Sequence, residues 1–509
     1  MRDWNYFNSL GMLIGESLAH LKMPLLDPWV CGGLDILSNP QNWIYSPFSI
    51  LNIFFHPYLA NLFSLLICAV FGFWGMLKLC EKMDESAEKY IIAALFNLSP
   101  FFFLHFAEGH IAYRTFYFLP LILFFSLNLN TILKLWWLLL ILMIMFLDGG
   151  IYPFYYSIFL LLLNLNYAGL KKIFLDKTQR KNLAILFFSI LFLAFSKIIP
   201  VLFIHQARLP VSEQIHYSLS NIIQAFFDIR QSNYLSMEGQ KYFFHEYGHY
   251  LGLGLTALFV SLLPNMKSSL RLFFQLILFI WIALGFGGDF NPWMVIKSLP
   301  FINQIHVQSR FLILFFLIFL SLIIKAYKPT RGRRWLLRLA LVELLVCAFF
   351  ASFNAFNFSI NLKEFKLATS SKPLKNYDYY IAKPFVYNSQ KISYQCYEPA
   401  NPTRLKPSSK FFLNTKDDLQ AIISNQTIRI ISNNPIHENF VINHNWNGGW
   451  DCLSGCETFS NTGLIQINPK NASEIIIKYN PIYWQISLAC FSIGLFFIIL
   501  VRRKIPDDF

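Results

Sequence analysis

Long apolar runs separated by short polar segments fill most of this chain. About eleven of these runs reach or approach the roughly 20 residues that are needed to cross a bilayer. They cover residues 56–79, 90–107, 116–129, 135–147, 154–167, 183–204, 250–263, 272–286, 311–326, 336–353 and 482–501. The pattern predicts an all-α polytopic membrane protein with about eleven transmembrane helices.

One long stretch breaks this pattern. Apolar and polar positions alternate in QAIISNQTIRIISNN and SEIIIKYN, which is typical of strands, and Asn447-Gly-Gly is a turn signal. We therefore expect a small β-rich domain over residues 354–481. The resulting organisation is an acidic loop or amphipathic segment (1–55), a multi-span domain (56–353), the β-rich domain, and a last helix with a basic tail (482–509).

Composition agrees with a membrane protein. Of the 509 residues, 55% are hydrophobic and 14% are charged, and the mean hydropathy is +0.46. A soluble protein carries about a quarter charged residues, so a soluble globular fold is excluded. The net charge of +14 comes mostly from short loops between apolar runs. Lysine and arginine residues in such loops are what the positive-inside rule predicts for a membrane protein. A nucleic-acid binder would instead carry a basic stripe on a soluble domain.

The charge of alternate loops gives the expected orientation. Lysine and arginine gather in every second loop and in the C-terminal tail, which we assign to the cytoplasm of a bacterial inner membrane. The segment from Asp3 to Pro47 holds four acidic residues and only Lys22 as a strong base. It is expected outside, with the β-rich domain. Cys452 and Cys456 then lie in a compartment that permits a disulfide, and a bridge and two free thiols stay open as alternatives.

Four polar segments expected at the outer surface are candidates for chemistry, because polar groups at membrane depth are costly. In the opening loop, Asp3 and Asp27 are carboxylates that a general base or a metal site requires, although a solvated loop position explains them equally simply. The sequence His105-Phe-Ala-Glu108-Gly-His110, followed by Arg114, resembles a metal-ligand cluster. Glu108 could hold Mg²⁺ or Mn²⁺, and an interfacial loop with snorkelling side chains is the alternative.

The other two segments lie further along the chain. Asp148-Gly-Gly-Ile-Tyr152 is a polar break, whose simpler interpretation is a tight turn with Asp148 solvated at its tip. His306 and Arg310 precede an apolar run, where the arginine could clamp a phosphate or anchor to lipid headgroups. His245-Glu-Tyr-Gly-His249 also looks metal-like, but it lacks the order of a metalloprotease motif.

These segments, in this order, resemble the GT-C superfamily of membrane glycosyltransferases, and the likeness is greatest to its bacterial YfhO-like group. The segments that carry it are Asp3 with the loop that follows, AEGHIAY, DGGIYP, SLPFINQIHVQSRF, NHNWNGGW and YNPIYW. The likeness runs over nearly the whole chain. It departs from the family at the start, where a helix normally precedes the first acidic residue but Asp3 follows closely on Met1.

The resemblance implies a function at the outer face. Asp3 matches the acidic residue taken as the catalytic base, and Glu108 matches a second acidic residue in the next outer loop. The donor would be a polyprenyl-phosphate-linked sugar, and the acceptor an envelope glycan, a lipid or a protein. The remaining candidates, including His110 and Arg310, would bind substrate. A flippase for a lipid-linked glycan and a non-catalytic scaffold with a glycan-binding outer domain are the alternatives.

Overall fold

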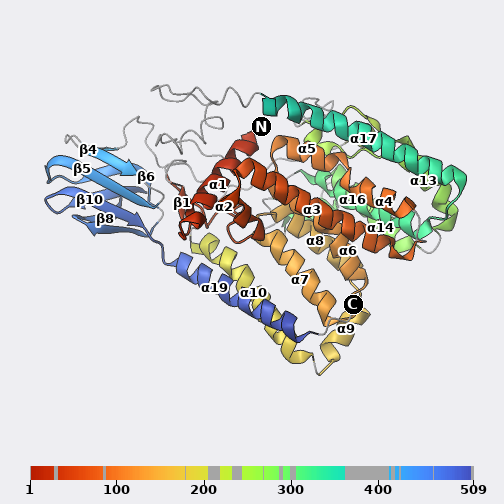
Figure 1. The fold of residues 1–509 in the computed structure, drawn as a ribbon, viewed down its shortest axis with the longest axis horizontal. Coiled ribbons are helices and arrows are strands. Elements are labelled where there is room, and N and C mark those ends of the chain that lie inside the picture. The colour runs from red at the N-terminus through yellow and green to blue at the C-terminus, as the bar shows by residue number, and fades with distance from the viewer. Residues whose placement is uncertain are drawn as a thin grey trace.

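The structure is a computed structural model that is mostly helical, with a separate β-rich region (Figure 1). It describes residues 2–27, 33–83, 87–177, 179–203, 218–231, 243–266, 269–285, 291–298, 305, 307–360, 412–413, 419–423, 426–446, 448–461 and 463–505. A multi-pass membrane protein with a small β-rich part near the C-terminus was the expectation, and this coarse architecture is confirmed.

Six helical segments are long and apolar enough to cross a membrane. They are α3 (Pro57–Leu79), α4 with α5 (Ala87–Asn97 and Pro100–Glu108), α10 (Arg180–Phe203), η6 with α16 (Gln308–Phe311 and Leu312–Ala326), α17 (Arg331–Ile360) and α19 (Tyr483–Lys504). A seventh span is possible if α8 (Ile151–Asn164) and α9 (Tyr167–Leu175), which bend by 90° at their junction, count as one. This length criterion, applied to the described residues, gives fewer spans than the pattern of apolar runs.

The other apolar runs also form helices, but shorter ones. Three have intermediate length: η3 with α6 (Ile111–Phe118 and Leu119–Leu127), α7 (Ile132–Leu147) and α14 (Leu270–Leu284). The remaining helical elements are η1 (Pro47–Ile50), α2 (Leu51–Phe54), η2 (Cys80–Lys82), α11 (Leu219–Phe227), α12 (Phe244–Tyr247), α13 (Gly252–Leu262), η4 (Leu263–Asn265) and α15 (Pro292–Ser298).

The acidic N-terminal segment begins as a helix, α1 (Arg2–Ala19). Its buried side chains recur at helical spacing and pack as one cluster with Trp43 and Ile111: Trp4, Tyr6, Phe7, Leu10, Leu13 and Ile14. An apolar stripe of this kind stabilises a helix against a neighbouring surface. Beyond α1, two-residue strands β1 (Leu26–Asp27) and β2 (Leu34–Asp35) pair antiparallel.

The β-rich region consists of two four-stranded antiparallel sheets. One has the order β4-β5-β10-β7, from strands Leu419–Ile423, Thr427–Ile436, Ala472–Tyr479 and Trp450–Ser454. The other has the order β3-β6-β9-β8, from strands Phe412–Leu413, Phe440–Asn445, Leu464–Pro469 and Cys456–Asn461. Buried isoleucines of both sheets belong to one hydrophobic cluster, so the sheets share a core. The strand prediction is confirmed for residues 412–479, and residues 361–411 of the predicted domain lie outside the described part.

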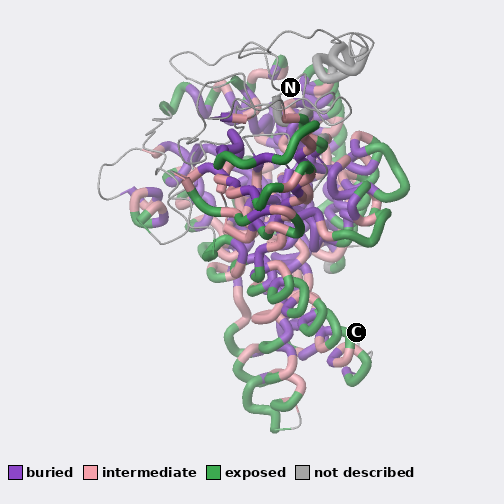
Figure 2. The backbone as a smooth tube through the Cα atoms, turned by 90° about the vertical axis from the view of Figure 1, so that its left-hand side faces the viewer, coloured by how far each residue is buried: buried purple, intermediate pink, exposed green. Residues whose placement is uncertain are grey.

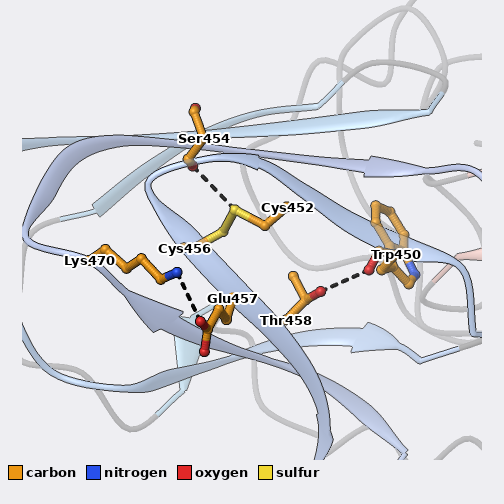
Figure 3. The surroundings of a disulfide bond; sticks show 7 residues. All are labelled: Trp450, Cys452, Ser454, Cys456, Glu457, Thr458 and Lys470. Carbon is orange, nitrogen blue, oxygen red and sulfur yellow. Dashed lines mark hydrogen bonds and ion pairs between the residues drawn. A yellow bond between two sulfur atoms is a disulfide. The ribbon is translucent and has the colours of Figure 1, made fainter.

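A disulfide joins Cys452 of β7 to Cys456 of β8 (Figure 3). These neighbouring strands belong to different sheets, and the turn between them contains Gly455 at φ +73°. Of the two alternatives for these cysteines, the structure contains the bridge. It therefore links the two sheets at the corner where the chain passes from one to the other.

Burial is greatest in the middle of the molecule (Figure 2). Helix α16 is buried over most of its surface, whereas α3, α10 and α19 expose large apolar side chains such as Val70, Phe187 and Phe496. Exposed apolar faces of this size are expected where helices meet lipid. Helices α10 and α19 pack side by side, although they are far apart in sequence (Figure 1).

Candidate functional site

A cluster of histidine, glutamate, arginine and tyrosine side chains lies where five elements meet. It combines His105 at the end of α5, His110 in the following turn, Tyr113 on η3, Tyr152 on α8, His245 and Glu246 on α12, and Arg310 on η6. These positions come from four separate parts of the sequence. The fold therefore assembles a polar group inside an otherwise apolar helical body.

Arg310 and Glu246 form the charged centre of this cluster. The guanidinium binds the carboxylate in a bidentate manner, with Nε donating to Oε2 at 2.5 Å and Nη2 donating to Oε1, and both side chains are buried. The guanidinium carbon also lies 5.1 Å and 4.6 Å from the ring centroids of Tyr113 and Tyr152. Among the described residues, Nη1 of Arg310 has no hydrogen-bond partner. One donor group of the arginine is therefore available for a ligand.

Three histidines surround this ion pair. Nδ1 of His105 lies 2.7 Å from Nδ1 of His110, so one ring donates to the other. Nε2 of His245 lies 3.6 Å from Oε1 of Glu246. Within the described part of the chain, Nε2 of His105 and Nδ1 of His245 are buried without a hydrogen-bond partner. Unpaired buried polar atoms are rare in proteins, and with Nη1 of Arg310 this cluster contains three of them among the described residues.

The electrostatics of α12 follow from burial and the arginine. Burial raises the pKa of Glu246, but the nearby Arg310 and then His245 outweigh it, so that the pKa lies well below its usual value. Burial lowers the pKa of His245, and Glu246 opposes that change. Burial also lowers the pKa of His249 to about 3. At neutral pH the cluster thus holds an ionised Glu246 beside a neutral His245.

The two ends of the HEYGH sequence face different surroundings. His245 and Glu246 belong to the cluster, whereas the ring of His249 stacks on Phe101 at a centroid distance of 5.1 Å. Three ligand atoms, one each from His110, His245 and Glu246, lie within 4.8 Å of one another and could hold a metal ion. Glu108, the expected metal ligand, is outside this trio, but it is close enough to His245 for the two side chains to interact electrostatically.

Helix α1 touches the same cluster from its N-terminal end. Trp4 donates from its indole nitrogen to the carbonyl of Phe106 at 3.0 Å. Gly109 has φ +93°, and a Cβ there would come within 2.4 Å of the Trp4 backbone nitrogen. The backbone beside Asp3 therefore contacts the turn between Glu108 and His110. Asp3 belongs to α1, and its side chain lies outside the described residues.

No family model matches the chain. Neither does any curated protein or solved structure. The resemblance to membrane glycosyltransferases consequently stays a prediction.

Arg114 and Asp148 form a second buried pair next to the cluster. Nε of Arg114 donates to Oδ2 at 2.9 Å and Nη2 donates to Oδ1 at 2.6 Å, while Ser46 donates to Oδ1 at 2.7 Å. Nη1 of Arg114 donates to Asn61 and Ser64 at 3.2 Å and 2.8 Å. Asp148 is wholly buried, so its interpretation as a solvated turn tip was wrong. The pair holds α3, η3 and α7 together.

Asp27 occupies a different place, at the junction with the β-rich region. It is buried in β1, which pairs with Leu34 and Asp35 of β2. Asp35 accepts hydrogen bonds from Tyr479 at 2.9 Å and from Tyr483. Burial raises the pKa of Asp35, and its hydrogen bonds to Tyr483 and Ser38 act against this. The carboxylates of the opening loop thus serve the junction between loop and β-rich region.

Lys197 is a buried base in the middle of α10. It donates to the carbonyl oxygens of Asn42 at 2.9 Å and Phe146 at 2.8 Å. A transporter would use such a charge in a substrate pathway. Here its hydrogen bonds go to the backbone of the opening loop and the end of α7, which is a structural role.

The structure brings together four of the predicted site residues: Glu108, His110, Tyr152 and Arg310. Arg114 and Asp148 lie in the adjacent pair, Asp27 lies at the junction, and His306 lies outside the described residues. The sequence pattern placed His105 in a metal-like cluster with Glu108 and His110, but it gave no sign that His245 and Glu246 would join that cluster. The signal for His245 and Glu246 was the HEYGH segment, which looks metal-like but lacks the order of a metalloprotease motif.

Proposed function

We propose that the protein is an integral-membrane glycosyltransferase with about eleven spans, which transfers a sugar from a polyprenyl-phosphate donor to a cell-envelope acceptor. Transfer takes place at the extracytoplasmic face of the bacterial inner membrane. The cluster around Arg310 and the first turn of α1 form its active site. The observation that carries the proposal is the convergence of Glu108, His110, Tyr152 and Arg310, from separate polar segments, on one buried polar cluster.

The chemistry of the transfer needs few groups. A lipid phosphate is a good leaving group, so the enzyme must chiefly supply positive charge or hydrogen-bond donors where its charge develops. Arg310 provides the cation, and its Nη1 group is unused by the described residues. A carboxylate near the acceptor hydroxyl acts as general base. Asp3 is the proposed base and Glu108 its neighbour, because the backbone at Trp4 packs against Gly109.

The distribution of charge supports the proposed orientation. Lys78, Arg271 and Lys325 line one cavity, so the ends of α3, α14 and α16 that carry them lie on the same side of the bundle. Arg310 lies at the opposite end of the η6–α16 segment from Lys325. With the basic ends in the cytoplasm, the cluster faces outward. The Cys452–Cys456 disulfide is compatible with an oxidising compartment for the β-rich region.

The test is a comparison of envelope glycans by mass spectrometry from cells with and without the protein, followed by transfer assays in nanodiscs with polyprenyl-phosphate sugars. Asp3→Asn should lower the rate by about 10²- to 10⁴-fold, the contribution of a positioned general base. Asp451→Asn is the matched control, because this aspartate is exposed on β7. It should transfer at the wild-type rate.

Two results would count against the proposal. Unchanged glycans in cells that lack the protein would remove the reason to call it a transferase. Full activity of Asp3→Asn, in protein that inserts normally, would leave the transferase but exclude Asp3 as its base.

A further inference from the structure

The trio of His110, His245 and Glu246 has the composition of a transition-metal site. Their three ligand atoms lie within 4.8 Å of one another, and they provide two imidazole nitrogens and one carboxylate oxygen. Zinc is bound by this donor set in sites where three protein ligands leave a position open. Magnesium instead prefers oxygen ligands and water. From this geometry we propose that the protein binds a zinc-type divalent cation through these three residues.

The spacing of the ligand atoms fits such an ion after a small adjustment. Metal–ligand distances near 2.1 Å place tetrahedral ligands roughly 3.4 Å apart. Nε2 of His245 and Oε1 of Glu246 are already 3.6 Å apart. His110 reaches the same point from the turn after Gly109, which closes α5 with φ +93°. The largest movement required therefore falls on a turn rather than on a packed helix.

The surroundings of His110 and Glu246 supply the support that metal ligands normally have. A ligating histidine usually hydrogen-bonds through its other ring nitrogen, and ligating carboxylates are themselves hydrogen-bonded. His105 contacts Nδ1 of His110 at 2.7 Å, which orients the His110 ring. Arg310 holds both oxygens of Glu246, which fixes the carboxylate but leaves lone pairs on each oxygen.

An independent observation points to a bound group at this place. Within the described part of the chain, the buried imidazole atoms Nε2 of His105 and Nδ1 of His245 have no hydrogen-bond partner. Such atoms in a native protein call for an ion, a water or a ligand. The other buried histidine of the HEYGH segment, His249, stacks on Phe101 instead and is excluded from the trio.

The charge of the cluster also favours a cation. The formal charges of Arg310, Glu246 and the nearby Glu108 sum to −1, so a divalent ion would bring the sum to +1. A net positive centre is what a lipid phosphate needs. The role of the ion at a lipid phosphate rests on the proposed function, whereas the binding of the ion does not.

The decisive experiment is metal analysis of protein carrying no histidine tag. The full chain is purified in detergent, incubated with ZnCl₂, desalted and analysed by inductively coupled plasma mass spectrometry. We expect one zinc per chain in the wild type. His110→Gln and His245→Gln should each lower this occupancy at least tenfold. His249→Gln, the matched control from the same segment, should keep it.

Glutamine is chosen because it keeps much of the side-chain volume, and Glu246 is left intact because its loss would leave Arg310 buried without a partner. Thermal unfolding with and without ZnCl₂ gives the second measurement. Zinc should raise the unfolding temperature of wild type and of His249→Gln, but not that of the two trio variants.

Wild-type protein without bound zinc would overturn the inference, even if no variant could be purified. Zinc that persists in both trio variants would overturn it as well. Bound zinc in a protein that transfers no sugar would leave the metal site standing and remove the proposed function. Sugar transfer by a zinc-free protein would do the reverse.

Discussion

Replacing Asp148 by asparagine should destabilise the protein severely. Asp148 is wholly buried and accepts three hydrogen bonds, two from Arg114 and one from Ser46. Asparagine keeps the shape of the side chain but removes its charge, and its amide group would point a donor at the guanidinium. Arg114 keeps only its bonds to Asn61 and Ser64. A buried charge that loses its partner costs about 3–5 kcal/mol.

Unfolding by SDS in mixed micelles, followed by tryptophan fluorescence, measures this loss. The control is Glu474→Gln, whose partner Arg429 is half exposed on the β-rich region, and an exposed pair is worth about 0–1 kcal/mol. Arg114→Met combined with Asp148→Leu should cost less than the sum of the two single changes, because neither charge is then left alone. A loss below about 1 kcal/mol for Asp148→Asn, or strict additivity in the double variant, would refute the reasoning.

Three further predictions concern the β-rich region and its junction. Gly33→Ala should expose the opening loop to protease, because Gly33 has φ +93° and a Cβ there would come within 1.9 Å of the His444 imidazole on β6. Gly448→Ala is the control, because Gly448 has φ +70° but open space around it, and it should leave the cleavage of the opening loop unchanged. Reduction of the Cys452–Cys456 bridge should destabilise the β-rich region by about 2 kcal/mol, from the entropy of a five-residue loop; an unchanged unfolding midpoint after verified reduction would contradict this. Because burial raises the pKa of Asp35 above 3.8, the folded protein holds this proton more tightly than the unfolded chain. Stability should therefore fall as the pH rises from 3.8 towards the folded pKa and then level off, and Asp35→Asn should remove this component from a series of unfolding temperatures measured against pH.

The helical architecture was largely predictable from apolar runs, because a buried or lipid-facing helix must be apolar over its length. Each predicted run overlaps a helix. The number of spans was harder to predict. Runs such as that of α14 form helices of intermediate length, and α8 and α9 bend sharply after Asn164. A run of apolar residues indicates a helix in an apolar environment, but it does not distinguish a crossing helix from a short buried one.

The candidate site was predictable only in part. Polar residues next to apolar runs indicated Glu108, His110 and Arg310, because polar groups there need a reason. Their partners could not be inferred. The ion pair of Arg310 with Glu246 joins α12 to η6 across 64 positions, and periodicity carries no information about such contacts. The same holds for Asp148, where a turn sequence gave no sign that Arg114 would cover it.

The junction at Asp35 has a consequence for how the protein is made. The loop that holds Asp35 and Tyr45 finds its partners on α19, with Tyr483 lying 448 positions and Ser487 lying 442 positions later in the chain. At ribosomal speed this separation corresponds to about 20–90 s of synthesis. During that time the buried carboxyl must stay hydrated or be sheltered by the insertion machinery. A chain stopped before residue 483 would retain this unpaired surface, which gives cellular quality control a feature by which to distinguish unfinished molecules from complete ones.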